Sequence, residues 1–202
     1  MVPAETTDKI IMFASNGKFY TLAGDKLPGG RGNGEPVRLL VDLPDDHVPI
    51  GLFVHKPDRK LLVASSEGYG FVVNETDVTA MKRGGKQVLN VKGDSEAVRC
   101  VEVVGDKIAT IGENRKILVF DVSEVPVMGR GKGVRLQKYK DGGLTDVITF
   151  TPEQGLTFTD SSNRTHSVSD WNILVGKRAQ AGRMAPRGFA RSGRFAPDHR
   201  LS

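Results

Sequence analysis

The sequence predicts an all-β fold built from repeated, propeller-like blades, and three observations lead to this. First, four segments share one layout: a short β-type run, a tight turn, a second β-type run, and a loop rich in glycine and basic residues. Second, the turns recur at intervals of 51, 46 and 49 residues, which is typical of a repeat protein. Third, no stretch shows sustained helical periodicity. The four segments are residues 9–22, 60–73, 107–120 and 155–168.

Each of these segments is predicted to form a β-hairpin. We take Gly17, Gly68, Asn114 and Asn163 as equivalent turn positions. Asn16-Gly17 predicts a type I′ turn, in which both central residues have positive φ. Asparagine tolerates that conformation better than most other non-glycine residues, so the third and fourth turns fit the same pattern.

Further β-type runs lie between the hairpins, at residues 37–41, 50–54, 88–91, 98–104 and 147–150. Together with the hairpins they give about four strands per repeat, which is the layout of a propeller blade. We therefore expect one domain at residues 1–186 with about four visible four-stranded blades. The blades are expected at roughly residues 8–55, 56–104, 105–150 and 151–186.

Residues 187–202 have a different composition. This segment combines small residues and arginines with two lone phenylalanines, Phe189 and Phe195. Such a composition cannot form a core of its own, so we expect a flexible basic C-terminal tail. The alternative is that the two phenylalanines dock on the last blade and close the whole propeller-like array of blades.

The overall composition is that of an ordinary globular protein, with 38% hydrophobic and 26% charged residues. The longest apolar runs are too short to span a membrane, and the N-terminal residues show no secretory signal pattern. Cys100 is the only cysteine, which excludes an internal disulfide and fits a reducing cytosol. These features predict a cytoplasmic protein without membrane insertion.

The positive charge is concentrated towards the C-terminal end. The net charge is +5, and from residue 176 onward seven basic residues stand against one acidic residue. A concentrated basic region suggests a polyanionic partner, with a solubilising tail as the equal alternative.

A loop rich in glycine and basic residues follows each hairpin, at residues 28–34, 81–87, 128–134 and 175–182. Glycine lets backbone amides approach a phosphate closely, and arginine and lysine neutralise it. The recurrence of these loops in every repeat predicts an interface for double-stranded DNA. The candidate DNA-binding residues are Arg31, Lys82, Arg83, Lys86, Arg130, Lys132, Arg135, Lys138, Lys140, Lys177, Arg178 and Arg183.

The third loop continues into a segment that is basic throughout, because residues 130–140 contain five basic residues and no acidic one. In a strand, Arg135, Gln137 and Tyr139 would share one face and present a row of hydrogen-bond donors. We interpret this row as a DNA contact. The alternative is a solvated edge strand that lysines protect against aggregation.

The sequence has no recognisable catalytic constellation. The four histidines are scattered without the spacing of metal ligands, and Cys100 lies in a strand pattern that predicts a buried, inert thiol. No glycine-rich nucleotide-binding motif is present. We therefore expect no catalytic, cofactor-binding or metal-binding residues in this chain, and no enzymatic activity of its own.

The loop Met81–Gln87 resembles the seven-residue box Gln-Arg-Arg-Gly-Gly-Lys-Gly in the C-terminal domain of the DNA gyrase A subunit. Arg83-Gly84-Gly85-Lys86 match it directly, Lys82 is a basic substitution, and Met81 and Gln87 depart from it. The wider sequence is similar to the C-terminal domain of the topoisomerase IV A subunit over nearly the whole chain. The segments that support this are residues 20–22, 27–32, 131–139 and 176–183.

This resemblance implies a β-pinwheel whose basic rim captures or bends a DNA duplex, the transported segment, during decatenation and supercoil relaxation for chromosome segregation. It implies that the partners include the rest of the A subunit, together with the B subunit of the parent enzyme. It also implies that ATP and Mg²⁺ act elsewhere in that enzyme, and that the protein associates with the nucleoid. We expect the isolated domain to be a monomer. The alternatives are the DNA-wrapping domain of gyrase and, from another class, a propeller-like platform for protein interactions.

Overall fold

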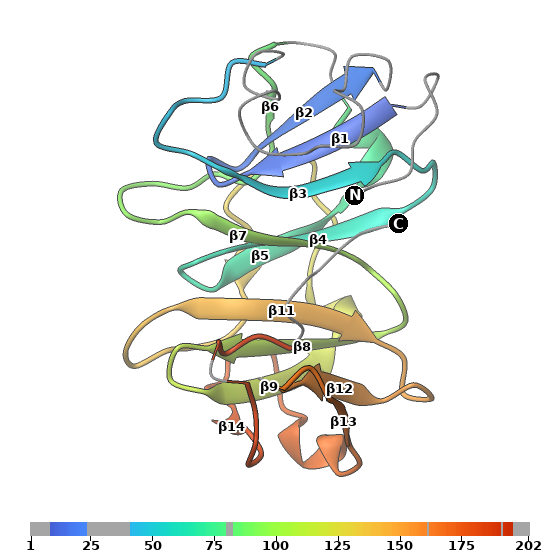
Figure 1. Cartoon of the computed structure of the whole chain (residues 1–202), viewed down its shortest axis with the longest axis vertical. Coiled ribbons are helices and arrows are strands. Elements are labelled where there is room, and N and C mark those ends of the chain that lie inside the picture. Colours follow the sequence, from blue (N-terminus) through green and yellow to red (C-terminus); the bar gives the residue numbers. More distant parts are fainter. Residues whose placement is uncertain (1–8, 24–40, 80–82, 161, 191, 196–202) are drawn as a thin grey trace.

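The computed structural model describes residues 9–23, 41–79, 83–160, 162–190 and 192–195. These residues form three four-stranded sheets and one two-stranded sheet, all antiparallel (Figure 1). The sheets follow one another along the long axis of the molecule in sequence order, from the N-terminal to the C-terminal repeat. The predicted all-β, propeller-like fold is thus confirmed, but among the described residues the fourth blade has two strands and not the four that were expected.

The first three sheets share one strand order. The first is β3 (Pro49–Val54), β1 (Lys9–Ala14), β2 (Lys18–Ala23) and β6 (Lys86–Gln87). The second is β7 (Ala97–Glu102), β4 (Lys60–Ser65), β5 (Tyr69–Asn74) and β10 (Val134–Arg135). The third is β11 (Leu144–Phe150), β8 (Lys107–Gly112), β9 (Lys116–Asp121) and β14 (Arg183–Met184). The fourth sheet consists of β12 (Leu156–Thr159) and β13 (Thr165–Val168).

Each four-stranded sheet takes its last strand from the following repeat. β6 lies beyond the second hairpin in sequence yet pairs with β2 of the first sheet, and β10 and β14 repeat this arrangement on the second and third sheets. The donated strands are only two residues long and cover part of an edge that would otherwise expose unpaired backbone groups. A sheet therefore draws on two successive repeats, and the loop that precedes each donated strand lies at the outer edge of the previous sheet.

Helix is limited to three short 3₁₀ turns among the described residues, η2 (Glu75–Asp77), η3 (Val122–Glu124) and η4 (Trp171–Leu174). None of the helices found in these parts of the chain is long and apolar enough to cross a membrane.

The first hairpin turn differs from the predicted type I′ geometry. In the first turn, residues 14–17, only the last residue has positive φ: Gly17 has φ 81°, whereas Asn16 is not in that region. Gly17 donates to the carbonyl of Ala14 at 2.9 Å, and the Asn16 side chain accepts from the amide of Lys18 at 3.0 Å. The prediction of positive φ at both central residues is wrong, because the asparagine side chain closes the turn instead.

The third turn has the same geometry as the first, and it changes which residue of this turn is equivalent to Gly17. Arg115, with φ 63°, occupies the left-handed position, and Asn114 plays the part of Asn16 by accepting from the amide of Lys116 at 3.1 Å. The equivalent turn residues are therefore Gly17, Gly68, Arg115 and Asn163, not Asn114 in the third repeat.

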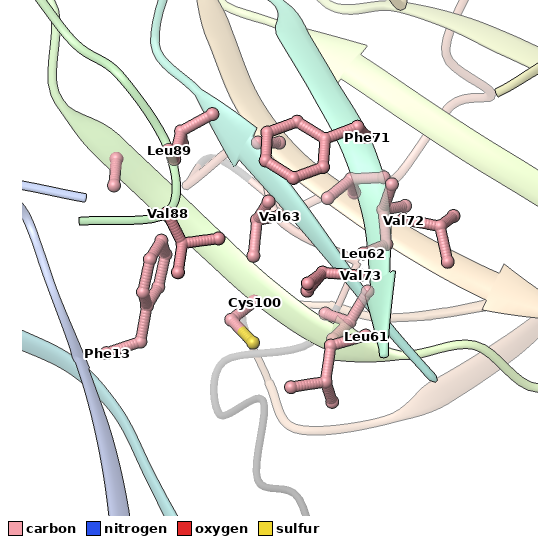
Figure 2. Close-up of a cluster of buried hydrophobic side chains, with 14 of the residues drawn as sticks. Phe13, Leu61, Leu62, Val63, Phe71, Val72, Val73, Val88, Leu89 and Cys100 are labelled. Carbon is pink, nitrogen blue, oxygen red and sulfur yellow. The ribbon is translucent and has the colours of Figure 1, made fainter. Parts of the chain in front are cut away.

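Apolar side chains fill the space between successive sheets. Figure 2 shows Phe13 of the first sheet beside Val88 and Leu89, with Val63 and Cys100 of the second sheet in the same cluster. Cys100 is buried as predicted, and this burial raises the pKa of its thiol.

Two buried ionic clusters tie neighbouring sheets together. The fully buried carboxylate of Glu75 accepts from Arg59 at 2.5 Å and contacts His55 Nδ1 at 2.6 Å, just beyond the end of β3. Asp146 of β11 accepts from Arg99 of β7 at 2.8 Å. Because an unpaired buried charge is costly, each cluster fixes how one sheet sits against the next.

The C-terminal segment is docked where the structure describes it. Phe189 and Phe195 are 5% and 2% exposed and pack with Phe158 of the fourth sheet. The amide of Phe195 donates to Asp146 at 2.8 Å, and the Arg115 guanidinium donates to the carbonyl of Phe189 at 2.9 Å. The predicted flexible tail is thus wrong for residues 187–190 and 192–195, because their phenylalanines cover the apolar face of a sheet with only two strands. The rest of the predicted tail lies outside the described residues.

Candidate nucleic-acid interface

The loops rich in glycine and basic residues occupy equivalent places on successive sheets. On the second sheet, Val72 of β5 forms a parallel bridge with Val127, and Tyr69 at the start of β5 pairs with Arg135. The loop between these two contacts therefore starts and ends beside β5, at the edge of the sheet. The third sheet repeats this with a bridge from Val119 to Val175 and the pairing of β14 with β9.

A glycine in the left-handed region precedes each donated strand. These residues are Gly85, Gly133 and Gly182, with φ of 72°, 84° and 84°. A Cβ atom on Gly133 would lie 2.2 Å from the carbonyl oxygen of Gly70, and one on Gly182 would lie 2.4 Å from that of Ile117. The structural reason for these three glycines is thus close packing on the preceding sheet, and not only the approach of a phosphate that the sequence suggested.

Neighbouring loops are joined to one another by backbone hydrogen bonds. Gly131 donates to the carbonyl of Val88 at 2.9 Å and accepts from Asn90 at 2.8 Å. In the same way, Lys138 donates to the carbonyl of Gln180 at 3.0 Å. The loops of three successive sheets therefore form one continuous edge. We call residues 83–90, 128–140 and 176–183 the box rim.

Most of the predicted DNA-binding residues lie on this rim with exposed side chains. Arg178 is half-buried, and Arg31 and Lys82 lie outside the described residues. The exposed ones are Arg83, Lys86, Arg130, Lys132, Arg135, Lys138, Lys140, Lys177 and Arg183.

The rim cations differ in their contacts within the protein. Arg83 pairs with Asp42 at 3.3 Å, and Lys86 donates to the backbone carbonyl of Asp77. Arg178 donates to the carbonyl of Arg135 at 2.8 Å, so it helps to hold two loops of the rim together.

Five rim cations have exposed side chains with no hydrogen bond or ion pair in the part of the chain that the structure describes. They are Arg130, Lys138, Lys140, Lys177 and Arg183. Such side chains can turn towards a polyanion without first giving up a partner.

The predicted row of donors on the third loop is wrong. Gln137 is fully buried and donates to the carbonyls of Lys116 and Ala181, both at 2.9 Å. The Tyr139 hydroxyl is buried, and burial raises the pKa of this phenol. Only Val134 and Arg135 are in strand conformation, so the alternation on which the row depended ends after two residues.

Tyr69 belongs to this surface and was not among the predicted residues. Its ring centroid lies 4.3 Å from Nζ of Lys132 and 5.3 Å from the guanidinium carbon of Arg135. The repeat pattern places Tyr69 at the start of a strand, but it does not tell which later residue pairs with it.

A cavity of about 520 Å³ lies beside the first residues of β3, β7 and β11. Its walls carry both acidic and basic side chains, among them Glu96, Glu113, Arg99 and Arg194. The cavity therefore does not present the uniformly positive surface that would attract a polyanion. No group of three or more potential metal ligands occurs among the residues that the structure describes.

The family model of the DNA gyrase C-terminal domain, beta-propeller, matches residues 8–55, 59–104 and 106–149. Among curated relatives, the A subunit of DNA topoisomerase 4 from Caulobacter vibrioides is 49% identical over 197 residues. That match covers 98% of this chain and 26% of the relative, so the chain spans about a quarter of that protein's length.

Solved structures agree with this result. The E. coli ParC C-terminal domain has a TM-score of 0.78 at 25% identity, covering 93% of this chain and 80% of that one. The C-terminal domain of DNA topoisomerase IV in another crystal structure has a TM-score of 0.74 at 18% identity, covering 89% and 58%. The second likeness concerns the fold alone. The resemblance seen in the sequence and the β-pinwheel that it implied are thereby confirmed.

Proposed function

This chain belongs to the DNA gyrase C-terminal β-propeller family, and from that membership we propose that it binds duplex DNA along the box rim. The observation that carries the proposal is the backbone linkage of the rim: loops from three successive sheets form one edge and place exposed cations on all of it. Regularly placed cations on a rigid edge suit the phosphate backbone, which needs charge and position but no base readout.

We also propose that the rim bends the duplex that it binds. The rim cations lie on three successive sheets and can contact DNA at separated points, and a duplex that reaches all of them would do so by bending. In the parent enzyme this would capture the transported segment during decatenation and supercoil relaxation. The catalytic parts would then lie in the rest of the A subunit or in the B subunit, with ATP and Mg²⁺ acting there and this domain serving as a non-catalytic, nucleoid-associated and monomeric module.

Strong gyrase-like wrapping is the alternative within the family, and Gln87 argues against it. The gyrase box has glycine at this position, whereas the Gln87 side chain donates to the carbonyls of Asn16 and Leu89 at 3.0 and 2.8 Å. The box is thus used in part for folding. Ligation of nicked circles in the presence of the chain distinguishes the two functions, because chiral wrapping changes the linking number and simple bending leaves it nearly unchanged.

Titration of a fluorescent, random-sequence duplex at several salt concentrations tests DNA binding. We expect sequence-tolerant binding whose log Kobs falls linearly with log salt, with a slope of about −0.9 per phosphate neutralised. A slope near zero or a strong preference for one sequence contradicts the proposal. The absence of any binding to plain duplex would instead favour a platform for protein partners.

A further inference from the structure

Tyr69 begins β5 directly after the second hairpin turn and contacts two cations of the rim. Its ring lies within cation–π distance of both Lys132 and Arg135. Arg135 Nη2 also donates a hydrogen bond of 3.0 Å to the Tyr69 hydroxyl. One aromatic side chain thus holds two long, basic side chains that would otherwise sample many rotamers.

The corresponding position of the other complete sheets is occupied by a cation. In each sheet this first residue of the hairpin's second strand pairs with a residue of the donated strand. The pairs are Lys18 with Gln87, Tyr69 with Arg135, and Lys116 with Met184. Each pair therefore contains one cation. A lysine in place of Tyr69 would face Arg135 directly, and like charges in such a position are destabilising.

We propose that Lys132, Tyr69 and Arg135 form one phosphate-binding unit of the rim, an inference that rests on the proposed DNA binding. A phenol hydroxyl both accepts and donates a hydrogen bond. Arg135 uses the Tyr69 oxygen as an acceptor, and within the described part of the chain the Tyr69 hydrogen has no acceptor. The hydroxyl can therefore donate to an external oxygen, and a DNA phosphate between the two cations would supply one.

The acidic neighbour of this unit does not block it. Glu67 lies 3.4 Å from Nζ of Lys132, and the two side chains are 44% and 57% exposed. An exposed pair of this kind contributes little, so a phosphate can replace the carboxylate. Tyr69 keeps Lys132 in place while this exchange happens.

Substitution of Tyr69 tests the unit in the full 202-residue chain, with the Kd for a labelled duplex as the readout. Tyr69→Phe removes only the hydroxyl and is expected to weaken binding by about threefold to tenfold. Tyr69→Leu also removes the ring and is expected to weaken it by about tenfold or more. Tyr69→Phe should leave the salt slope unchanged because no charge is removed. Tyr69→Lys adds a positive charge and should nevertheless bind no more tightly than the wild type.

Tyr139→Phe is the matched control. Tyr139 falls within rim residues 128–140, but its side chain packs against the hydrophobic core and its hydroxyl is buried without a partner among the described residues. Removal of this hydroxyl should therefore not change the affinity for DNA. In an Arg135→Gln background, Tyr69→Phe should have a smaller effect than in the wild type, since the two groups act together.

Two outcomes separate this inference from the function on which it rests. Suppose that the wild type binds DNA and that Arg135→Gln weakens this binding while Tyr69→Phe and Tyr69→Leu do not. The proposed phosphate-binding unit is then wrong, and the proposed DNA binding along the rim still stands. Tighter binding by Tyr69→Lys likewise overturns the unit, because charge alone would then decide affinity. A wild-type chain that does not bind duplex DNA overturns the proposed function itself.

Discussion

The rim cations differ in how firmly their side chains are held by partners within the protein, and this decides which of them can turn to a DNA phosphate. Arg83 pairs with Asp42, but both side chains are more than 60% exposed, so the pair exchanges readily for a phosphate. Arg178 is different, because it bonds to the carbonyl of Arg135 and its own amide donates to Glu124 at 3.0 Å. Its guanidinium therefore positions the rim, and substitution of Arg178 should affect the stability of the loops as well as charge.

Charge reversal on the rim should weaken DNA binding far more than charge reversal elsewhere. The rim set is Arg130, Lys132, Arg135 and Lys138, and the control set is Lys9, Lys56 and Lys60, whose side chains are also exposed. We expect the rim variant, with all four replaced by glutamate, to lose roughly a hundredfold or more in affinity. The control variant should lose only a few-fold at the same salt concentration. Fluorescence anisotropy with a labelled duplex measures the DNA affinity of both variants. Equal losses of affinity would mean that DNA does not bind along the rim.

Single residues also show where sequence patterns stop being informative. The basic residues of the third loop were recognisable by their number and by the glycines around them. The inward orientation of Gln137 was not, because it depends on the carbonyls of Lys116 and Ala181, which lie 21 and 44 residues away. Tyr69 was missed for the same reason, since its partner Arg135 is 66 residues away.

At the level of elements, the four hairpins could be predicted because each is local. Their β-type runs lie next to a turn with glycine or asparagine, and both signals fall within about fifteen residues. The donated strands β6, β10 and β14 could not be predicted as strands. Each has only two residues, and it becomes a strand by pairing with a hairpin of the preceding repeat.

The docked C-terminal segment gives a prediction for one element. Phe195→Ala should destabilise the protein by about 3 kcal/mol, because it removes a buried ring that packs against the fourth sheet. For a domain of this size that corresponds to a fall in Tm of roughly 6–12 °C. Arg187→Ala is the control, since this exposed side chain lies in the same segment. Thermal unfolding followed by circular dichroism measures the Tm of both variants. An unchanged Tm for Phe195→Ala would contradict the docking of Phe195 and support a flexible C-terminal segment.

For the whole molecule, the repeat, the donated strands and the rim are consequences of one arrangement. Because every four-stranded sheet is completed by the next repeat, the loop before each donated strand is carried to the outer edge. Because successive loops are hydrogen-bonded, that edge is continuous. The buried pair of Arg99 and Asp146 then fixes the second sheet against the third, so the spacing of the cations is set by the core. An edge whose cation spacing is set in this way suits the DNA bending that we propose.

The DNA bending that we propose would require the whole rim, and cyclisation of short DNA measures it. A fragment of about 150 base pairs is close to the persistence length of DNA, so its ends seldom meet and ligation into circles is slow. Saturating amounts of the chain should accelerate this ligation, because a bent complex brings the ends together. Neutralising the cations at the two ends of the rim, Arg83 and Lys86 on one side and Lys177 and Arg183 on the other, should reduce the acceleration even at saturation. A variant with Lys9 and Lys60 neutralised should behave as the wild type. If the end-neutralised variant still accelerates cyclisation fully once it is saturated, the middle of the rim alone bends DNA and the linked loops do not act together in bending.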